Sequence, residues 1–384
     1  MAVEQIKKVI ISFCLLLSVS LVMSQQCFPV ECKLDNQHFS SDTCAFWDDD
    51  AKTYYLQGCS SSSSCSGFSI SKGINFTCTA NPTTSVLKWP GEKCTITDST
   101  SNCNTQYATG GCVSGVCQGQ KEGGTCSVND DCNPGLYCDT ALRCVSQVGI
   151  GGECQNDYQC VNSAGCNKTS TETYGTCVAY FNISSHDPIA ECPVGEYTNY
   201  LCSSSLCDTT NNGENYCLSS ITSKFGSLLP VICQESSECV SSTDSKDGAY
   251  LTGQCICGYN KLGYGFCNQY PGDPDYAHLL LMWKKWLWSS AANNCNTNRR
   301  RSAVCMADWW DTTDYTMLQY FNLKVTNWPY IQMNDNCTQS VLMAQYYQAQ
   351  QAYNALRNTT DPDEHGDSSS LILIGSAFML LTYA

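Results

Sequence analysis

The longest apolar runs of this chain lie at its two ends, and between residues 27 and 267 apolar positions are scattered among Ser, Thr, Asn and Gly. The first run, Val9–Val22, follows two lysines and is short for a membrane span, which is typical of a secretory signal peptide. Small or modest side chains three residues and one residue before Gln25 predict cleavage there. We therefore expect residues 1–24 to be removed as a signal peptide.

The second run, Leu371–Ala384, has no charged residue after it. A membrane-spanning helix needs about twenty apolar residues. A shorter tail, behind a polar spacer and a triplet of small residues, is typical of the signal for a glycosylphosphatidylinositol (GPI) anchor. The triplet begins at Asn358, so residues 358–384 are predicted to be an anchor signal with Asn358 as the attachment site. A triplet at Gly366 leaves almost no spacer, and a short transmembrane tail is the alternative to the anchor.

Helical periodicity appears between residues 270 and 357 and predicts a small α-helical subdomain close to the membrane. Asp273 followed by Pro274 is a typical helix start, with the aspartate as the cap. A second short helix is predicted over residues 313–323. A third is predicted over 336–356, with an apolar face, spaced as in a heptad repeat, that is expected to pack on the first helix. The apolar positions of the first helix are Tyr276, Leu279, Leu280, Trp283, Trp286 and Leu287, and those of the third are Leu342, Tyr346, Ala349, Tyr353 and Leu356.

The middle of the chain cannot build a large apolar core, and its cysteines indicate what replaces one. The chain has 31 Cys, and removal of Cys14 with the signal leaves an even number. Cysteine usage this high after a signal peptide indicates disulfide bonds rather than zinc ligands. The spacing alone does not say which cysteines pair. Beyond Cys267 there are only Cys295, Cys305 and Cys337.

Residues 91–269 contain a repeat of about thirty residues with four cysteines, clear in three units and looser after residue 192. A glycine shortly before the first cysteine, at Gly91, Gly123 and Gly151, predicts a tight turn with positive φ. Each unit is expected to hold short strands and turns around its bridges. The candidate disulfide cysteines are Cys94, Cys103, Cys112, Cys117, Cys126, Cys132, Cys138, Cys144, Cys154, Cys160, Cys166 and Cys177 in the clear units, and Cys295 and Cys305 in the helical part.

The second unit, from Gly123 to Cys138, resembles the cysteine-rich module at the N-terminus of Dickkopf proteins and the related EB-type modules. In those modules Gly-x-x-Cys-x5-Cys leads to Gly-x-Tyr-Cys, as it does here. The resemblance covers residues 91–177 well and 192–267 poorly, and it implies a disulfide-stapled fold without a function. With both ends included, the whole chain is similar to the cysteine-rich GPI-anchored surface proteins of ciliates. The expected fold class is small disulfide-rich repeats followed by a small α-helical, membrane-proximal subdomain.

Residues 25–90 hold six cysteines that do not follow the repeat spacing, and they are predicted to form a separate N-terminal cysteine-rich module. Several Asn-x-Ser/Thr sequons behind a signal peptide indicate a glycoprotein. Asn358 is also a sequon, but it is the predicted anchor site. The candidate glycosylation sites are Asn75, Asn167, Asn182 and Asn336.

The formal net charge is −15, which argues against nucleic acid and against direct binding to anionic lipid. The sequence has no His-Glu-x-x-His pair, no Gly-x-Ser-x-Gly elbow and no phosphate-binding glycine loop. We therefore expect no enzyme, no cofactor and no metal site.

Two features of the helical part leave alternatives open. Arg299-Arg300-Arg301 is expected to be an exposed loop tip, with a cleavage site, a patch for acidic glycans or the reactive loop of a protease inhibitor as alternatives. The tryptophans of this part are expected to fill its core, with a stacking platform for carbohydrate as the alternative. They are Trp283, Trp286, Trp288, Trp309, Trp310 and Trp328.

Together these patterns predict a non-enzymatic, disulfide-stabilised glycoprotein on the extracellular face of the plasma membrane, held there by a lipid anchor or by its C-terminal tail. Its repeats are expected to stack into a rigid rod on the helical pedestal. It would act as a coat, adhesion or ligand-binding protein toward an extracellular protein or glycan. The alternatives are a secreted or surface-bound protease inhibitor and a single-pass, receptor-like membrane protein.

Overall fold

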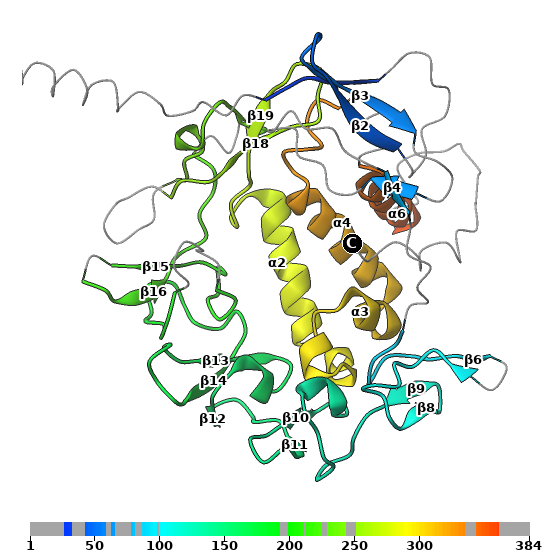
Figure 1. Cartoon of the computed structure of the whole chain (residues 1–384). Coiled ribbons are helices and arrows are strands. Elements are labelled where there is room, and N and C mark those ends of the chain that lie inside the picture. The colour runs from blue at the N-terminus through cyan, green and yellow to red at the C-terminus, as the bar shows by residue number, and fades with distance from the viewer. Residues whose placement is uncertain are drawn as a thin grey trace, which may run out of the picture.

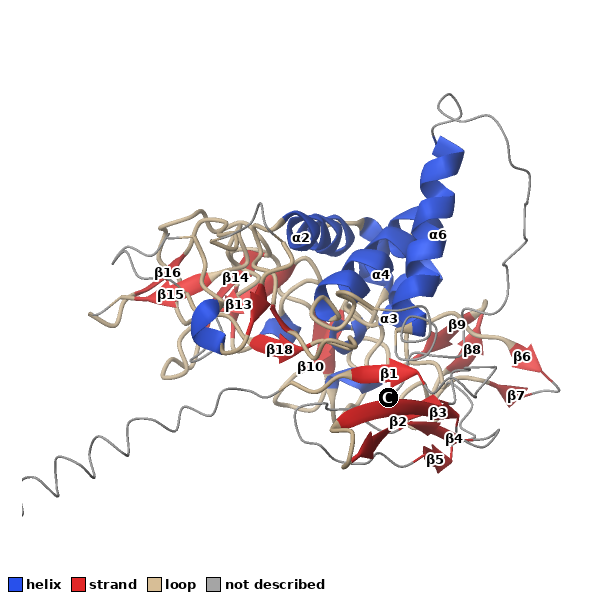
Figure 2. Ribbon diagram, turned by 90° about the horizontal axis from the view of Figure 1, so that it is seen from above, coloured by secondary structure: helices blue, strands red, loops and turns tan. Residues whose placement is uncertain are grey.

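The computed structural model describes residues 27–32, 43–58, 63–65, 78–80, 87–97, 100–192, 199–210, 212–224, 229–242, 251–334 and 343–360. The predicted signal peptide, the tail beyond residue 360, Asn75 and Asn336 lie outside these residues. Short strands in small sheets precede a group of helices (Figure 1, Figure 2). The expected combination of small disulfide-rich units and a later helical part is confirmed.

All five repeat units share one pairing of four cysteines, first to third and second to fourth, and Cys257, a fifth cysteine in unit 5, pairs outside its unit. Units 4 and 5, between residues 192 and 267, follow it although their spacing is looser. The local sequence therefore varies while the cross-linking pattern stays constant. In unit order the bridges are Cys94–Cys112 and Cys103–Cys117, Cys126–Cys138 and Cys132–Cys144, Cys154–Cys166 and Cys160–Cys177, Cys192–Cys207 and Cys202–Cys217, and Cys233–Cys255 and Cys239–Cys267.

The third and fourth cysteines of every unit face each other across an antiparallel hairpin. Because one bonds to the first cysteine and the other to the second, each hairpin fastens two loops of its unit. In units 1, 2, 3 and 5 the small buried clusters consist mainly of cysteine, so cross-links take the place of a core. The hairpins are β8 (Gly111–Val113) with β9 (Val116–Gln118), β10 (Leu136–Cys138) with β11 (Cys144–Ser146), β13 (Ala164–Asn167) with β14 (Gly175–Ala179), β15 (Cys207–Thr209) with β16 (Asn215–Cys217), and β18 (Cys255–Cys257) with β19 (Gly265–Cys267).

Three units carry additional short strands. β12 (Glu153–Cys154) joins β14 in unit 3, and β17 (Ile232–Cys233) joins β19 in unit 5, which makes three-stranded sheets. In unit 1, β6 (Ile96–Thr97) pairs with β7 (Thr100–Ser101) inside the loop between the first two cysteines.

A side chain directly before the second cysteine stabilises this loop in four units. It accepts a hydrogen bond of 2.6–3.0 Å from the backbone N–H that follows the first cysteine. Unit 4 has Pro193, which lacks an N–H, and Leu201, which lacks an acceptor, at these two positions. The sequence of unit 4 therefore lacks both the donor and the acceptor of this hydrogen bond, so neither group is left without its partner. The accepting residues are Asn102, Asp131, Gln159 and Glu238, the last three in or next to the 3-10 turns η2 (Asn129–Asp131), η3 (Asp157–Gln159) and η5 (Ser236–Glu238).

The glycine before each clear unit makes the predicted left-handed turn. Gly91, Gly123 and Gly151 have φ of +90°, +78° and +86°. Each donates its N–H to the carbonyl of the fourth cysteine of its unit at 2.8 Å. In unit 4 the same bond comes from His186, a non-glycine residue with φ of +69°. Only a residue that tolerates positive φ can close the unit in this way.

The N-terminal module is joined to the last unit of the repeat. Its sheet has the order β1-β3-β2, and its buried Val30, Tyr54 and Leu56 pack with Cys257 and Tyr259 of unit 5. The bridge Cys27–Cys257 makes the connection covalent. The strands of the module are β1 (Val30–Cys32), β2 (Thr43–Asp48), β3 (Thr53–Gly58), β4 (Ser63–Cys65) and β5 (Cys78–Ala80).

The described helical part contains α2 (Pro274–Leu287), α3 (Ala303–Trp309), α4 (Thr312–Thr326) and α6 (Ala344–Thr360), with 3-10 turns η6 (Ser290–Asn294) and η7 (Thr297–Arg299). The three predicted helices correspond to α2, α4 and α6. Buried Leu279 and Trp286 of α2 share a cluster with Leu318 and Phe321 of α4. The helical periodicity therefore identified the faces that form the largest core of the molecule.

One helix prediction is confirmed in position only, and another is wrong. Asp273 is the N-cap residue of α2, as predicted, but its carboxylate makes no capping hydrogen bond and instead accepts N–H bonds from Ser223 at 2.9 Å and Tyr270 at 2.7 Å. The third helix, α6, packs on α4, which lies between α6 and α2 (Figure 2). The rings of Tyr320 and Tyr353 stack there, with centroids 4.3 Å apart.

The units wrap around the helices instead of forming a rod. In Figure 1 the hairpins follow one another from β8–β9 to β18–β19 around α2 and α3. The largest apolar cluster contains Leu201 and Cys207 of unit 4 together with Trp286 of α2. The prediction of a rod on a separate pedestal is therefore wrong. The physical reason is that the units have almost no core of their own and dock on the helices.

Gly151 tests the left-handed turn, because its φ is +86° and a Cβ added there meets no atom within 4 Å. We expect Gly151→Ala to lower the unfolding free energy by about 1–2 kcal/mol through backbone strain alone. Gly149→Ala is the matched control, since Gly149 also faces open space and its φ lies outside the left-handed region. Denaturant unfolding with the disulfides intact measures the difference, and equal midpoints for the two variants would contradict the strain.

Candidate functional site

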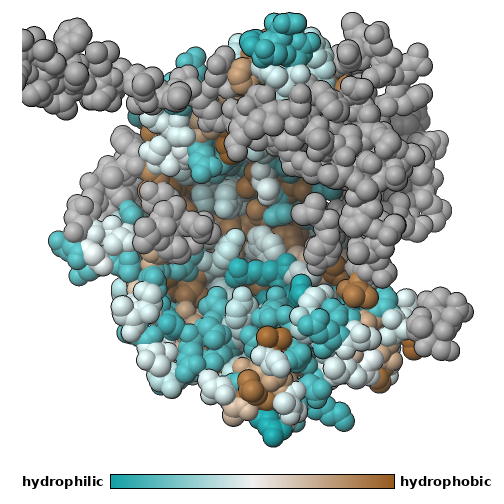
Figure 3. Space-filling view, in the orientation of Figure 1, coloured by the Kyte–Doolittle hydropathy of each residue, from teal (hydrophilic) through white to brown (hydrophobic). Residues whose placement is uncertain are grey.

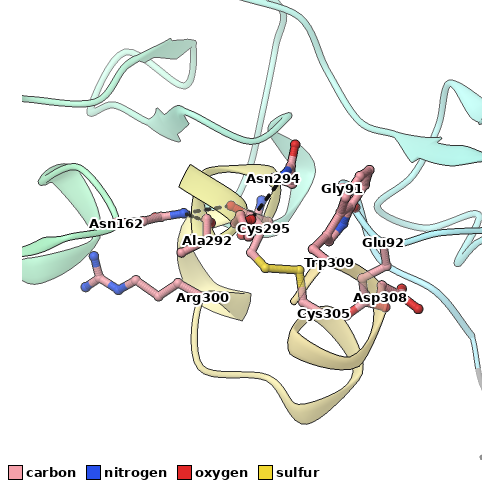
Figure 4. Close-up of a disulfide and its surroundings, with 12 residues drawn as sticks. Gly91, Glu92, Asn162, Ala292, Asn294, Cys295, Arg300, Cys305, Asp308 and Trp309 are labelled. Carbon is pink, nitrogen blue, oxygen red and sulfur yellow. Dashed lines mark hydrogen bonds between the residues drawn. A yellow bond between two sulfur atoms is a disulfide. The ribbon is translucent and has the colours of Figure 1, made fainter. Parts of the chain in front are cut away.

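The segment 288–310, which we call the hub, lies where units 1, 2 and 3 meet the helices. It contains η6, η7 and α3 and is closed by the bridge Cys295–Cys305, whose two cysteines are fully buried (Figure 4). Three of its polar side chains, Asn296, Thr297 and Arg300, are buried as well. Buried polar groups need hydrogen-bond partners, and here the partners belong to the repeat units.

Hydrogen bonds between side-chain donors and backbone carbonyls join the hub to units 2 and 3. Asn296 donates to the carbonyls of Asn129 at 2.8 Å and Cys132 at 2.7 Å. In the reverse direction, Asn162 of unit 3 donates to the carbonyls of Ala292 at 2.7 Å and Cys295 at 2.9 Å (Figure 4). The bonds from Asn296 use only backbone groups of unit 2, whereas those from Asn162 depend on a side chain of unit 3.

Arg300 is the charged member of this set, with only 4% of its surface exposed. Its guanidinium donates to the carbonyls of Ala164 at 3.2 Å and Asp157 at 3.1 Å. Burial lowers the pKa of Arg300 from its ordinary value, but an arginine keeps its proton in proteins. The prediction that the arginine triplet is an exposed loop tip is therefore wrong at Arg300.

The two neighbouring arginines are also held against aromatic rings. The guanidinium of Arg299 lies 3.5 Å from the ring centroid of Trp89, and that of Arg301 lies 4.6 Å from the ring centroid of Tyr200. Arg301 alone is exposed. A protease inhibitor needs a protruding reactive loop, and this segment does not supply one.

Unit 1 meets the hub through charged groups. Lys88 pairs with Asp308 at 3.1 Å, and Asp308 also accepts the backbone N–H of Lys93 at 2.8 Å. The indole N–H of Trp309 donates to the carbonyl of Gly91 at 2.8 Å. Glu92, at the same place, is 1% exposed, and burial raises the pKa of its carboxyl. We call this contact between residues 88–93 and 308–309 the seam.

A small open pocket of about 370 Å³ lies beside the seam. Apolar side chains and the Trp309 indole form part of its wall, and neutral hydrogen-bonding groups form the rest. The Nζ of Lys93 lies 4.9 Å from the Trp309 ring centroid. Such a mixture suits a small polar ligand with an apolar face. The lining residues are Gly91, Val113, Ser114, Val116, Gln118, Pro134, Asn294 and Trp309.

The structure does not bring the tryptophans together as one platform. Trp286 is fully buried and donates to the carbonyl of Arg300 at 2.6 Å, with Trp310 packed 5.2 Å from it. Trp288 is half exposed and donates to the carbonyl of Tyr180. The core-filling interpretation therefore holds for Trp286, and Trp309 is the member of the set that lines the pocket.

The described candidate modification sites differ in exposure. Asn182 is exposed on a turn, whereas Asn167 is half-buried in β13, where its side-chain oxygen accepts the N–H of Ala190 at 2.9 Å. Asn358 is exposed near the end of α6. Glycosylation and lipid attachment at these positions stay predictions.

Metal binding has no support from the cysteine clusters. Groups of three sulfurs lie within 4.8 Å of one another in units 1, 2, 3 and 5, where two bridges cross. Each of these sulfurs is bonded to another cysteine, so none is a free thiolate ligand.

No sequence signal indicated the seam or the hub contacts. Lys88 and Asp308 are 220 positions apart, and Asn162 and Cys295 are 133 positions apart. Single asparagines, glutamates and lysines in a polar chain are not distinguishable from surface residues. Only the cysteines of the hub were predicted.

Comparisons with known proteins identify no family. No protein-family model, no curated protein and no solved structure matches the chain. The resemblances to Dickkopf-type modules and to ciliate surface proteins therefore stay predictions. Among the helices of the described residues, none has both the length and the apolar character that crossing a bilayer requires.

Arg300 and Arg301 provide a matched test of the hub. We expect Arg300→Ala to lower the unfolding free energy by about 2–4 kcal/mol, because one buried and one partly buried carbonyl lose their donor and a void is left. Arg301→Ala removes an exposed cation and is expected to cost about 1 kcal/mol or less. Denaturant unfolding of the secreted protein, with limited proteolysis as a second readout, measures both. Similar losses for the two variants would show that Arg300 does not hold units 2 and 3 to the hub.

Proposed function

We propose that this protein is a non-enzymatic glycoprotein of the outer cell surface that binds an extracellular ligand through the tips of its cross-linked units. The disulfides of all five units place it among extracellular or secreted, disulfide-stabilised proteins. Surface display and ligand binding go beyond that assignment, and each has its own support and test.

The exposure of large apolar side chains at the hairpin tips carries the binding proposal. Val113, Leu142, Tyr174 and Leu262, in units 1, 2, 3 and 5, are each 51–53% exposed. Single exposed apolar residues are ordinary, but here one lies at or beside the hairpin turn in each of four separate units. Loops held by a rigid scaffold are common binding sites.

The pocket beside the seam extends the same surface inward. Val113 lies at the tip of the β8–β9 hairpin and also lines the pocket. A ligand that contacts the tip of unit 1 could therefore place a small polar group against Trp309. A glycan or a peptide with an apolar face has the required chemistry.

The sequence ends support attachment to the membrane. We propose that the tail directs a GPI anchor to Asn358, with a short transmembrane tail as the competing form. A glycolipid would hold the units outside the cell without a membrane-spanning helix.

Phospholipase treatment of intact cells that express the full chain distinguishes the two forms of attachment. We expect phosphatidylinositol-specific phospholipase C to release the protein into the medium, because the enzyme cuts the glycolipid and not a peptide. A co-expressed marker with a transmembrane helix serves as the control and should stay on the cells. Retention of the protein after verified release of a second GPI-anchored marker would favour the transmembrane tail.

Adhesion of cells that display the full chain tests the binding surface. On plates coated with defined glycans and with extracellular-matrix proteins, we expect the wild type to adhere to at least one coating. Leu142→Asp combined with Tyr174→Asp and Leu262→Asp should reduce adhesion to background, because desolvating three carboxylates opposes contact with the ligand.

Leu281→Asp is the matched control, since Leu281 is 63% exposed on α2 and belongs to no hairpin tip. It should leave adhesion unchanged at equal surface expression. Equal losses for both variants would remove the hairpin tips from the proposal. Absence of adhesion by the wild type on every coating would leave a coat function in place of ligand binding.

A further inference from the structure

Apart from the exposed Lys93, five charged side chains gather at the seam: Lys88, Glu92 and Asp308 belong to it, and Arg299 and Asp130 lie beside it. Lys88 and Asp308 are paired at 3.1 Å, and Arg299 lies 3.7 Å from Asp130. Glu92 is the fifth, and it is the most deeply buried glutamate of the described residues, at 1% exposed. A change of charge here acts directly on the contact between unit 1 and the hub.

Glu92 has no cation to balance it. The cations Lys88 and Arg299 already face the carboxylates Asp308 and Asp130. One Glu92 oxygen accepts the backbone N–H of Trp89 at 3.0 Å, and the other is buried with no hydrogen-bond partner in the described part of the chain. With Glu92 ionised the cluster carries one excess negative charge away from water, and with Glu92 protonated it is neutral.

The remaining groups around the seam do not correct this imbalance. Lys93 is exposed, and its ammonium lies over the Trp309 ring. Tyr315 of α4 faces Asp308; burial, and secondarily Asp308, raise the pKa of Tyr315 to about 12, so it stays neutral. The Trp89 ring stacks between the guanidinium of Arg299 and the ring of Tyr107. Figure 4 shows Glu92 next to Asp308, and the negative charge of Asp308 further disfavours ionisation of Glu92.

We propose that Glu92 is a proton-operated latch for unit 1. When Glu92 is protonated, unit 1 sits on the hub with the bonds from Lys93 to Asp308 and from Trp309 to Gly91 intact. When Glu92 ionises, the uncompensated charge draws water into the seam and these bonds open. The other units stay in place, because their contacts with the hub use Asn162, Asn296 and Arg300, which do not titrate in this range.

The sign of the pH dependence follows from the burial. Burial raises the pKa of Glu92 above its ordinary value of 4.5; the Trp89 N–H and Lys88 oppose the increase, Asp308 adds to it and Arg299 opposes it. The closed seam therefore binds the proton more tightly than the open seam does. The closed seam is most stable relative to the open seam below about pH 4.5, and this stability falls as the pH rises through the raised pKa of Glu92.

The latch also controls the pocket. Gly91 and Trp309 line the pocket and are the direct neighbours of Glu92 and Asp308 in the chain. Opening the seam removes the contact between these two walls. Any ligand held in the pocket would then bind more tightly at acid pH, and this consequence alone rests on the proposed function.

Hydrogen exchange at two seam protons tests the latch without a ligand. The backbone N–H of Lys93 and the indole N–H of Trp309 both donate across the seam. After correction for intrinsic exchange, we expect their protection in the full secreted protein to fall several-fold as the pH rises from 4.5 through the raised pKa of Glu92, because the open seam releases the proton more readily than the closed seam. The backbone N–H of Cys144, bonded within unit 2, should keep constant protection.

Glu92→Gln keeps the shape of the side chain but cannot ionise, so protection at the seam should stay high at every pH. Glu153→Gln, at an exposed glutamate, is the matched control and should retain the wild-type profile. Glu92→Asp keeps an acid at this position and should retain the pH dependence, which keeps the test decisive if the glutamine variant folds poorly. A pH-dependent loss that persists in Glu92→Gln, or a flat wild-type profile, would overturn the latch.

Discussion

The rest of the structure depends on hydrogen bonds from buried side chains of the hub to backbone carbonyls of the units. Units 1, 2 and 3 are small and their buried clusters are mostly cysteine, so they have little apolar surface with which to dock. The hub holds the units instead through buried hydrogen-bond donors, such as Asn296 and Arg300, which bond to backbone carbonyls of the units. A carbonyl is present whatever the side chain, so these bonds depend on the fold of a unit and not on its sequence; Asn162 of unit 3, whose side chain donates to the hub, is an exception. This explains how units of different sequence dock on the same hub.

Covalent and non-covalent links have separate roles in this arrangement. The bridges within units close short loops, with 12 to 28 positions between partners. They define each unit, but they cannot set its place relative to the next. Cys27–Cys257, with a separation of 230, is the long-range bridge among the described residues. Closing so long a loop restricts the unfolded chain more than a local bridge does. It fastens the N-terminal module to unit 5, while the hub positions units 1 to 3.

The sequence was informative where structure follows from local pattern and uninformative where it follows from distant contacts. Cysteine spacing identified the units, positive-φ turns were predicted at Gly123 and Gly151, and periodicity identified the buried face of α2. The arrangement of the units around the hub was not predicted. It rests on residues such as Asn162 and Glu92, which resemble surface residues in a polar chain. The arginine triplet was misread for the same reason, because charged residues between two cysteines normally lie in solvent. Pairing within each unit also needed the structure.

The contacts that hold the units in place differ in chemistry, and some of them titrate while others do not. Units 2 and 3 are held by amides and an arginine, whose bonds are the same at every ordinary pH. Buried carboxylates lie elsewhere, Glu92 in unit 1 and Asp273 at the start of α2, at the far end of that helix from the hub. Burial raises the pKa of both. They are not equivalent, because both oxygens of Asp273 accept backbone N–H bonds, which stabilise its ionised form. Glu92 has one such bond and an unpaired oxygen. Two carboxylates of similar burial therefore have different roles. Asp273 makes permanent hydrogen bonds that hold the start of α2, whereas protonation of Glu92 decides whether unit 1 is closed on the hub or loosened from it.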